Sequence, residues 1–218
     1  MKSQITFLVL IILFTFSQFT AGQEKPKAKL VNELSYEPCE RIRSSLDNLM
    51  RDLLDESESK GYIVISGDKS LETVNAKEWV DGQFKYRKFD EERWVTVKDE
   101  NSKEYKIQMW KVPKGAEMPF SFKREFDYSL SLRKPLLFYG LEEGNCPEAD
   151  HYKMFCDFLR ANPNLRGNVV VYEKTLNQFR KIKRELLKKS ISISPNRLRF
   201  FSRKSSYSFF QLWLIPKN

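Results

Sequence analysis

IQMWKVPK, residues 107–114, and FQLWLIPK, residues 210–217, repeat one phrase near the end of each half of the chain. Four of the eight positions are identical, namely the glutamine, the tryptophan, the proline and the lysine. Each phrase places apolar side chains on both faces of a predicted strand. We therefore expect this strand to lie within a sheet or against the sister copy, and not at a bare edge.

The elements before each phrase also occur twice, about 105 residues apart, which fits duplicated domains better than a solenoid of shorter repeats. A buried central strand is predicted at KGYIVISG, residues 60–67, and at RGNVVVYE, residues 166–173, because a β-branched run follows a glycine. Apolar residues at three- and four-residue steps predict a helix before each strand. Farther on, Arg93 matches Arg197.

Each copy therefore predicts a strand, a helix, a strand, a second helix and a hairpin. The leading strands are predicted at residues 28–34 and 134–140. In the later copy the second helix has an apolar stripe opposite a set of basic residues, whereas in the earlier copy Asp81 and Gly82 interrupt the pattern.

The fold class that follows is α/β (α+β), with two tandem βαβαββ-type domains, each a mixed sheet with helices packed on one face. Their predicted bounds are residues 23–116 and 134–218, with a connection at residues 117–133. This connection is rich in aromatic residues, so we expect it to pack on a domain and not to behave as a free linker.

Residues 1–22 are typical of a signal peptide. One lysine precedes a short apolar run, and small residues follow it. The run is shorter than the roughly 20 residues that span a bilayer, and no later stretch approaches a span. The prediction is a secreted or periplasmic protein in an oxidising compartment, without a membrane span after cleavage.

The net charge of +9 is concentrated in the second half of the chain. Residues 23–119 carry 18 Lys and Arg against 20 Asp and Glu, or −2, while residues 120–218 carry 19 against 9, or +10. A basic surface outside the cytosol indicates anionic polymers, acidic proteins or membrane headgroups as partners and makes nucleic acid improbable. Nothing in the sequence indicates an oligomeric state.

The stretch FRKIKRELLKKSISISPNRLRF, residues 179–200, preceded by NPNLRGNVVVY, residues 162–172, resembles the peptidoglycan-associating domain of OmpA-like proteins. The first copy is similar through KGYIVISGD, residues 60–68. The resemblance implies a helix, a central strand, a basic helix and a turn into a hairpin. The repeated layout and its W-x-V-P ending, residues 110–113, also resemble uncharacterised secreted bacterial proteins.

The resemblance also implies a ligand site, made of an aspartate in the loop after the central strand and an arginine early in the second helix. In the later copy this loop is Glu173-Lys174-Thr175, and Arg180 lies near the arginine position. In the earlier copy Asp68 follows Gly67 directly, and no arginine follows before residue 87. The resemblance therefore implies the fold and not peptidoglycan binding.

Three cysteines leave the redox state open. Cys39 and Cys146 precede the first helix of each copy, so an inter-domain disulfide and two free thiols are equal alternatives. Cys156 falls on a core position and is predicted to be a buried thiol. With one histidine and no Cys-x-x-Cys, a metal site is not expected.

Catalytic motifs are missing from the sequence, so we predict no enzyme, no catalytic residue and no cofactor. The alternative is a cell-envelope hydrolase or thiol-dependent enzyme, and its only tools are His151 and a cysteine. A helical spacing of five residues directs His151 away from Cys156, which favours a surface histidine. Trp110 and Trp213 could stack on sugars, but their apolar strands favour core positions.

Basic residues of the second copy are the strongest indication of binding. They form either the solvated face of an amphipathic helix or a docking surface for an anionic envelope polymer or an acidic protein. We predict a non-catalytic binding or structural protein of the bacterial envelope, with a protein-protein adaptor as a further alternative. The candidate residues are Arg180, Lys181, Lys183, Arg184, Arg197 and Arg199.

Overall fold

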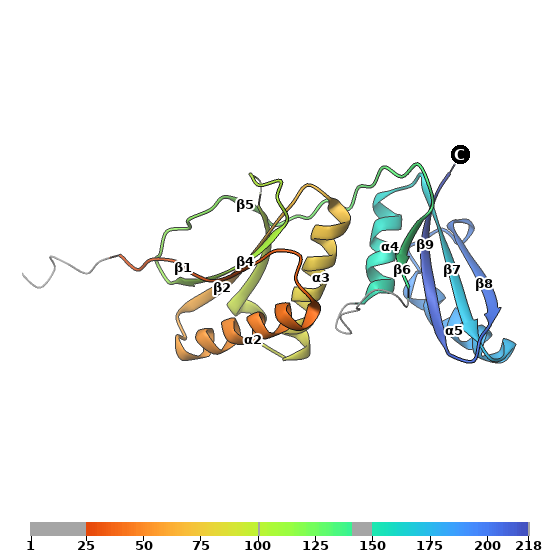
Figure 1. Cartoon of the computed structure of the whole chain (residues 1–218), viewed down its shortest axis with the longest axis horizontal. Helices are drawn as coiled ribbons and strands as arrows, with labels where there is room; N and C mark the ends of the chain where they lie inside the picture. The colour runs from red at the N-terminus through yellow and green to blue at the C-terminus, as the bar shows by residue number, and fades with distance from the viewer. Residues whose placement is uncertain (1–24, 100, 141–149, 218) are drawn as a thin grey trace, which may run out of the picture.

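The computed structural model of the chain describes residues 25–99, 101–140 and 150–217, so the predicted signal peptide and Cys146 lie outside the described residues. Two domains follow one another along the chain (Figure 1). The elements of the first are β1 (Lys29–Leu34), α2 (Cys39–Asp55), β2 (Ser59–Ser66), α3 (Ser70–Tyr86), β3 (Trp94–Asp99), β4 (Lys106–Pro113) and β5 (Phe122–Lys123). Those of the second are β6 (Leu136–Tyr139), α4 (His151–Ala161), β7 (Leu165–Glu173), α5 (Leu176–Lys189), β8 (Leu198–Lys204) and β9 (Phe209–Pro216).

Four strands of each sheet follow the same order, and the first sheet has β5 as a fifth strand at its edge. The first runs β1-β4-β2-β3-β5 and the second β6-β9-β7-β8. In each, the central strand pairs in parallel with the strand after the second helix and antiparallel with the closing strand. The α/β fold with two mixed sheets is thus confirmed, and the closing strands β4 and β9, which carry the repeated phrase, lie inside their sheets as expected.

The glycine at the third position of each central strand allows close packing of the first helix on the sheet. A Cβ atom on Gly61 would lie 2.9 Å from a methyl carbon of Leu53, and one on Gly167 would lie 2.6 Å from the ring of Phe155. Real Cβ atoms do not approach neighbours so closely, because protein interiors are already close-packed. Both glycines pair with the closing strand and with the parallel strand, in equivalent positions of like elements.

In each domain an arginine at the equivalent position binds the end of the first helix. Arg93 donates hydrogen bonds to the backbone carbonyls of Leu53 and, at 2.9 Å, Glu56. Arg197 does the same in the second domain, to the carbonyls of Leu159 at 2.6 Å, residue 162 at 2.6 Å and residue 165 at 2.8 Å. The carbonyls of Leu53, Glu56 and Asn162 each also accept one backbone N–H of the turn. A carbonyl oxygen can accept two hydrogen bonds, and the guanidinium supplies the second. The Arg197 side chain is therefore engaged in hydrogen bonds within its own domain, which gives no support to its predicted role as a binding residue.

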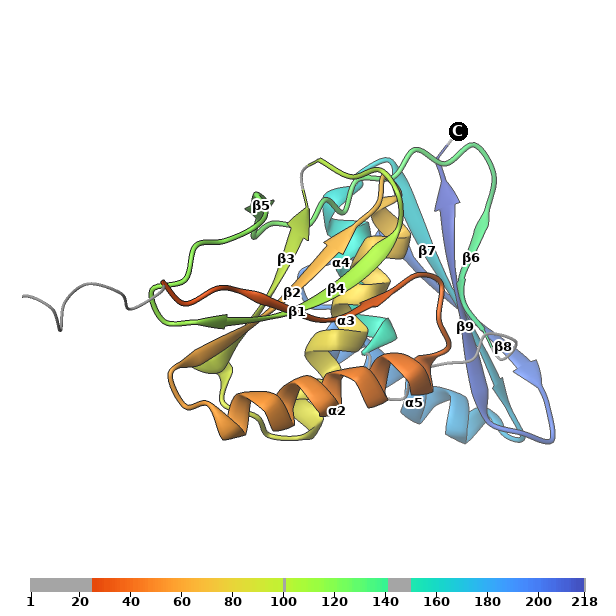
Figure 2. The same ribbon diagram turned by 60° about the vertical axis from the view of Figure 1, so that its left-hand side comes forward.

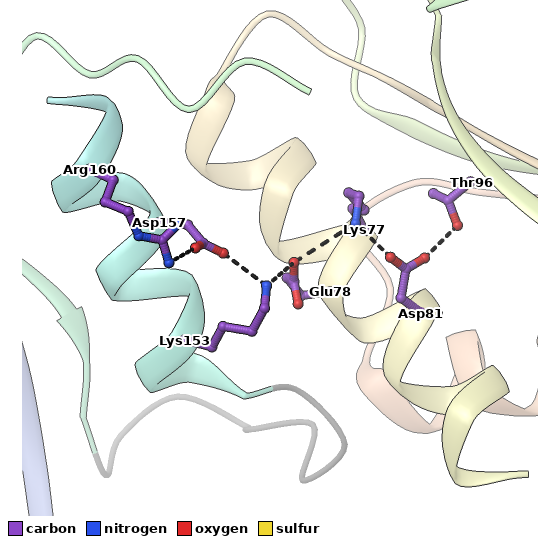
Figure 3. Close-up of polar contacts among 7 residues, drawn as sticks. All are labelled: Lys77, Glu78, Asp81, Thr96, Lys153, Asp157 and Arg160. Carbon is purple, nitrogen blue, oxygen red and sulfur yellow. Dashed lines mark hydrogen bonds and ion pairs between the residues drawn. The ribbon is translucent and has the colours of Figure 1, made fainter. Parts of the chain in front are cut away.

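The second helix of the first domain, predicted despite the interruption of its pattern at Asp81 and Gly82, is continuous. Asp81 accepts hydrogen bonds from Lys77 Nζ at 2.6 Å and from Thr96 Oγ1 at 2.7 Å. Both of its carboxylate oxygens are thus satisfied by neighbours on α3 and β3 (Figure 3). Tertiary contacts outweigh the weak helix propensity of these two residues.

The connection between the domains packs on both of them, as its aromatic content predicted. Phe126 is buried in the common apolar cluster. Farther on, the Asn162 side chain accepts from the backbone N–H of Leu130 at 2.7 Å and donates to the carbonyl of Tyr128 at 2.8 Å. The buried amide therefore fixes the chain where it enters the second domain.

Helices α3 and α4 face one another between the two sheets (Figures 1 and 3). Lys153 Nζ on α4 lies 2.9 Å from Asp157 and 4.0 Å from Glu78 on α3. The buried apolar residues of both domains belong to one continuous cluster. Helix α3 is thus interior to the molecule, between its own sheet and the second domain.

Candidate anion-binding surface

Helix α5 begins with a complete capping box. The Thr175 hydroxyl accepts from the backbone N–H of Gln178, and the Gln178 side chain accepts from the backbone N–H of Thr175. Leu186 is buried, and Phe179 and Ile182 pack against the core. One stripe of the helix therefore binds the sheet, and its other faces are left to solvent.

The outer side of α5 carries cations without acidic partners. Arg180, Lys181 and Arg184 are exposed, and within the described part of the chain no carboxylate lies within ion-pairing distance of them. Lys188 differs, because it pairs with Glu185 at 3.2 Å. Three positive charges are thus available to a partner within about one turn and a half of helix.

Apolar side chains lie among these cations. Leu187 is 41% exposed and Ile191 is 88% exposed. Both line a shallow hollow, together with Arg180, Lys183, Arg184 and Lys188. Lys183 also places its ammonium 5.6 Å from the ring centroid of Phe200. A surface of this kind suits an anionic group that is attached to an apolar or sugar-like body.

The predicted basic set does not form one surface. Arg180, Lys181, Lys183 and Arg184 lie on α5, whereas Arg199 lies on β8, in register with Asn168 of β7 and two residues from the internal Arg197. Side chains alternate along a strand, so Arg199 points to the face of the sheet that carries no helix. The prediction grouped these residues because they are close in sequence, but α5 and Arg199 lie on opposite faces of the sheet.

The thiol of Cys156 is a free, buried side chain, as predicted. Burial raises its pKa to about 11. The thiol is therefore protonated at neutral pH, and a protonated thiol is a poor nucleophile.

His151 is the first residue of α4, and it was expected at the surface. That expectation is wrong: the ring is half-buried, and its centroid lies 4.4 Å from that of Tyr139. Tyr139 is the last residue of the short strand β6, whose position the helical pattern around His151 could not show.

Cys39 begins α2 and is buried. Because Cys146 lies outside the described residues, the Cys39–Cys146 disulfide stays a prediction. Mass mapping under non-reducing conditions tests it, and finding all three cysteines as free thiols would remove it.

The two repeated tryptophans were expected in the core, but both are half-buried on the helix-free face of their sheets. Each Nε1 contacts the glutamine two residues earlier, at 3.4 Å for Trp110 with Gln108 and 3.3 Å for Trp213 with Gln211. Trp110 also packs on Phe120, with 5.4 Å between the ring centroids. The repeated phrase thus contributes to the second face of the sheet as well as to the core.

The loop residues that the OmpA-like resemblance points to have other tasks. Glu173 is 3% exposed and accepts a hydrogen bond from the Ser208 hydroxyl. In the first copy Arg87 pairs with Asp47 of α2, away from the loop that holds Asp68. Among the described residues, neither copy therefore brings a loop carboxylate and a second-helix arginine together as a ligand site.

Searches within the described ranges find no helix with the length and apolar character needed to cross a membrane and no group of three or more His, Cys, Asp or Glu residues placed to hold a metal ion. In comparisons with known proteins, no family model, no curated protein and no solved structure matches this chain.

Proposed function

We propose that this chain is a secreted, non-catalytic binding protein of the bacterial cell envelope, whose second domain contacts an anionic polymer through the outer side of α5. The observation that carries the proposal is the cluster of Arg180, Lys181 and Arg184 beside Leu187 and Ile191. These three cations are exposed, and no carboxylate of the described residues pairs with them. The envelope location rests on the predicted signal peptide and on the OmpA-like resemblance.

The spacing of the cations supports a repetitive anionic ligand. Arg180 and Arg184 are four residues apart, so they lie on one side of the helix with Leu187, and Ile191, just beyond the end of the helix, lines the same hollow. Guanidinium groups bind phosphates and carboxylates through two parallel hydrogen bonds. A polymer with regularly spaced anions can occupy several such groups at once, and its affinity then arises from many modest contacts.

The thiol-enzyme alternative receives little support. The described thiol nucleophile, Cys156, is buried, and its raised pKa keeps it neutral. His151 packs on Tyr139, so its half-buried ring is already part of a local packing contact. Neither residue lies in the surface that α5 presents.

Co-sedimentation and titration of the full mature chain with polyglycerol-phosphate teichoic acid and with lipopolysaccharide test the proposal. The R180E/K181E/R184E variant changes only exposed side chains, and we expect it to lose at least about tenfold in affinity, equivalent to about 1.4 kcal/mol. Raising the salt concentration from 50 to 500 mM should weaken binding of the wild type strongly, since exposed charges are screened.

A matched control reverses three exposed cations outside the second domain, K85E/K103E/R124E. It has the same net charge as the α5 variant and should bind nearly as the wild type does. Equal losses in both variants would show a nonspecific charge effect, and binding that is absent or insensitive to salt would refute the proposed function.

A further inference from the structure

The helix-free face of the first sheet is covered by its own chain. Residues 117–123, here named the covering segment, leave β4 and form a bridge from Glu117 to Lys27 beside β1. The segment ends in β5, which pairs with β3 at the other side of the sheet, with Phe122 opposite Asp99 (Figure 2). It therefore crosses the face from one edge to the other.

Two phenylalanines of the covering segment pack on this face. The Phe120 ring lies 5.4 Å from Trp110 and 6.2 Å from Tyr62, and the Phe122 ring lies 5.9 Å from Tyr62. Beneath the segment, valines of the sheet are closed to solvent, as the exposed fractions show: Val64 1%, Val97 0% and Val112 7%.

The equivalent face of the second sheet is open. The positions of those three valines are occupied by Val170, Phe201 and Ile215, and Trp213 replaces Trp110. Phe201 is 41% exposed, and the other three are half-buried. Among the described residues, the ring contacts of this face stay within the sheet, where Tyr172 stacks on Phe209 at 4.1 Å.

The open face also carries positive charge. Arg199 and Arg203 of β8 pair in register with Asn168 and Tyr172, on the same side as Phe201. They replace an uncharged residue and an acid of the first sheet, since Val95 and Asp99 hold the corresponding positions. No described carboxylate forms an ion pair with either arginine. Duplication has thus left an apolar, aromatic face with cations along one edge.

We propose that this face, made of Val170, Trp213, Phe201 and Ile215 with Arg199 and Arg203, docks an extended segment of a partner protein that carries aromatic residues at alternate positions and acidic residues beside them. The covering segment shows the fit, because Phe120 and Phe122 are two residues apart and both contact the equivalent face. Side chains two apart in an extended chain point to the same side.

The edge of the second sheet offers the same backbone pairing. Strand β8 is the last strand in the order β6-β9-β7-β8, whereas its counterpart β3 is paired by β5. Edge strands with unpaired N–H and C=O groups accept an added strand from another chain. The docked segment can therefore pair its backbone with β8 and place its aromatic side chains on the apolar face of the sheet.

A second copy of this chain fits less well. Two open faces packed together would bring Arg199 and Arg203 against their like, which is costly without a counter-charge. The covering segment of another copy ends in Lys123 and is followed by Arg124, and both have the same sign as the face. Charge complementarity therefore selects an acidic partner segment.

Three synthetic peptides test the proposal on the full mature chain, with fluorescence anisotropy as the measurement. The first is Glu-Glu-Pro-Phe-Ser-Phe-Glu-Glu, the second has alanine for both phenylalanines, and the third has lysine for every glutamate. We expect the first to bind at least about tenfold more tightly than either of the others, since both rings and both signs of charge contribute.

Two variants separate this site from α5. R199E/R203E alters exposed side chains, and it should weaken the acidic peptide about tenfold while strengthening the lysine peptide, because the charge preference is reversed. R180E/K181E/R184E should leave all three peptides unchanged, so failure of polymer binding and failure of this site are distinguishable.

Several results would overturn the proposal: absence of peptide binding at millimolar concentration, equal binding of the three peptides, or indifference to R199E/R203E. Sedimentation that shows a dimer of the wild type, dissociated by R199E/R203E, would overturn it in favour of self-association.

Discussion

Helices α3 and α5 hold the same place in the two domains, yet they have different surroundings. Helix α3 buries residues around much of its circumference, among them Val74, Ala76, Val80 and Phe84, and it faces α4. Helix α5 buries only Leu186 and exposes a basic side. The same contrast holds for the sheets, since one helix-free face is covered and the other is open. The two domains share the strand order and the packing contacts of glycine and arginine, whereas their outer surfaces differ.

This comparison locates the candidate binding surfaces in the second domain. The first domain uses its second helix and its covering segment for internal packing, so little of either remains for a partner. The second domain presents α5 on one side of its sheet and the open face on the other (Figure 2). A protein with these two surfaces could hold an anionic polymer and a protein segment at the same time, which agrees with the adaptor alternative.

The largest loss of stability is expected at the glycine of the central strand, where packing is tighter in the second domain than in the first. Replacing Gly167 by alanine forces a Cβ to within 2.6 Å of the Phe155 ring and 2.7 Å of Leu159, whereas at Gly61 the shortest approach is 2.9 Å, to a flexible leucine methyl. We expect G167A to destabilise the protein by about 3 kcal/mol and G61A by about 1 kcal/mol. Urea unfolding measures both, and equal costs would contradict the packing difference.

Arg93 and Arg197 should contribute equally to the stability of the protein. Replacing either by methionine removes the guanidinium hydrogen bonds to the backbone carbonyls at the end of the first helix and in the following turn, at a cost of about 2 kcal/mol. The matched control R199M removes an exposed arginine from the same strand region and should cost under about 0.5 kcal/mol. An R197M protein as stable as R199M would show that the internal hydrogen bonds contribute nothing.

Removing an aromatic ring that covers the first sheet should lower the free energy of unfolding more than removing one from the open face of the second. Phe120→Ala removes a ring that packs on Trp110 and Tyr62, and we expect a loss of about 1.5 kcal/mol. Phe201→Ala removes a ring that is 41% exposed and should cost under about 1 kcal/mol. Denaturant midpoints of the two variants provide the comparison, and a reversed order would argue that the open face is covered in solution.

The smallest effect concerns Cys156 and pH. Burial raises the pKa of its thiol from 9.0 to about 11, so the folded state holds the proton more tightly than the unfolded state does. The resulting stability is fully present below about pH 9 and is lost as the pH rises through about 11. Urea midpoints between pH 8 and 11 should fall more steeply for the wild type than for C156A, whatever the offset between them. Identical slopes would contradict a buried, neutral thiol.

The fold was predictable because its determinants are local and occur twice. A glycine before a β-branched run, an apolar stripe at helical spacing and a repeated closing strand each indicate one element, and their repetition confirms the order. The amphipathic pattern of α5 likewise identified Arg180 and Arg184 as exposed. These signals depend on the spacing of residue types along the chain, which can be read directly from the sequence.

What could not be predicted depends on contacts between distant segments. The aromatic residues of the connection indicated packing, but no period showed that Phe120 and Phe122 would cover the first sheet. Arg197 and Arg199 have different roles. Arg197 precedes β8 and donates to backbone carbonyls, whereas Arg199 lies within β8 and points to the helix-free face. The duplicated Arg93 was the one available signal for the internal role of Arg197, since a shared arginine at the same place is more easily explained by the shared fold than by a ligand.

The difference between α3 and α5 can be measured in one experiment on the full mature chain. Hydrogen–deuterium exchange with and without polyglycerol-phosphate teichoic acid reports which backbone segments are protected by the polymer. We predict added protection in residues 176–191 and none in residues 70–86. Protection centred on the first domain, or exchange unchanged throughout at saturating polymer, would contradict the account.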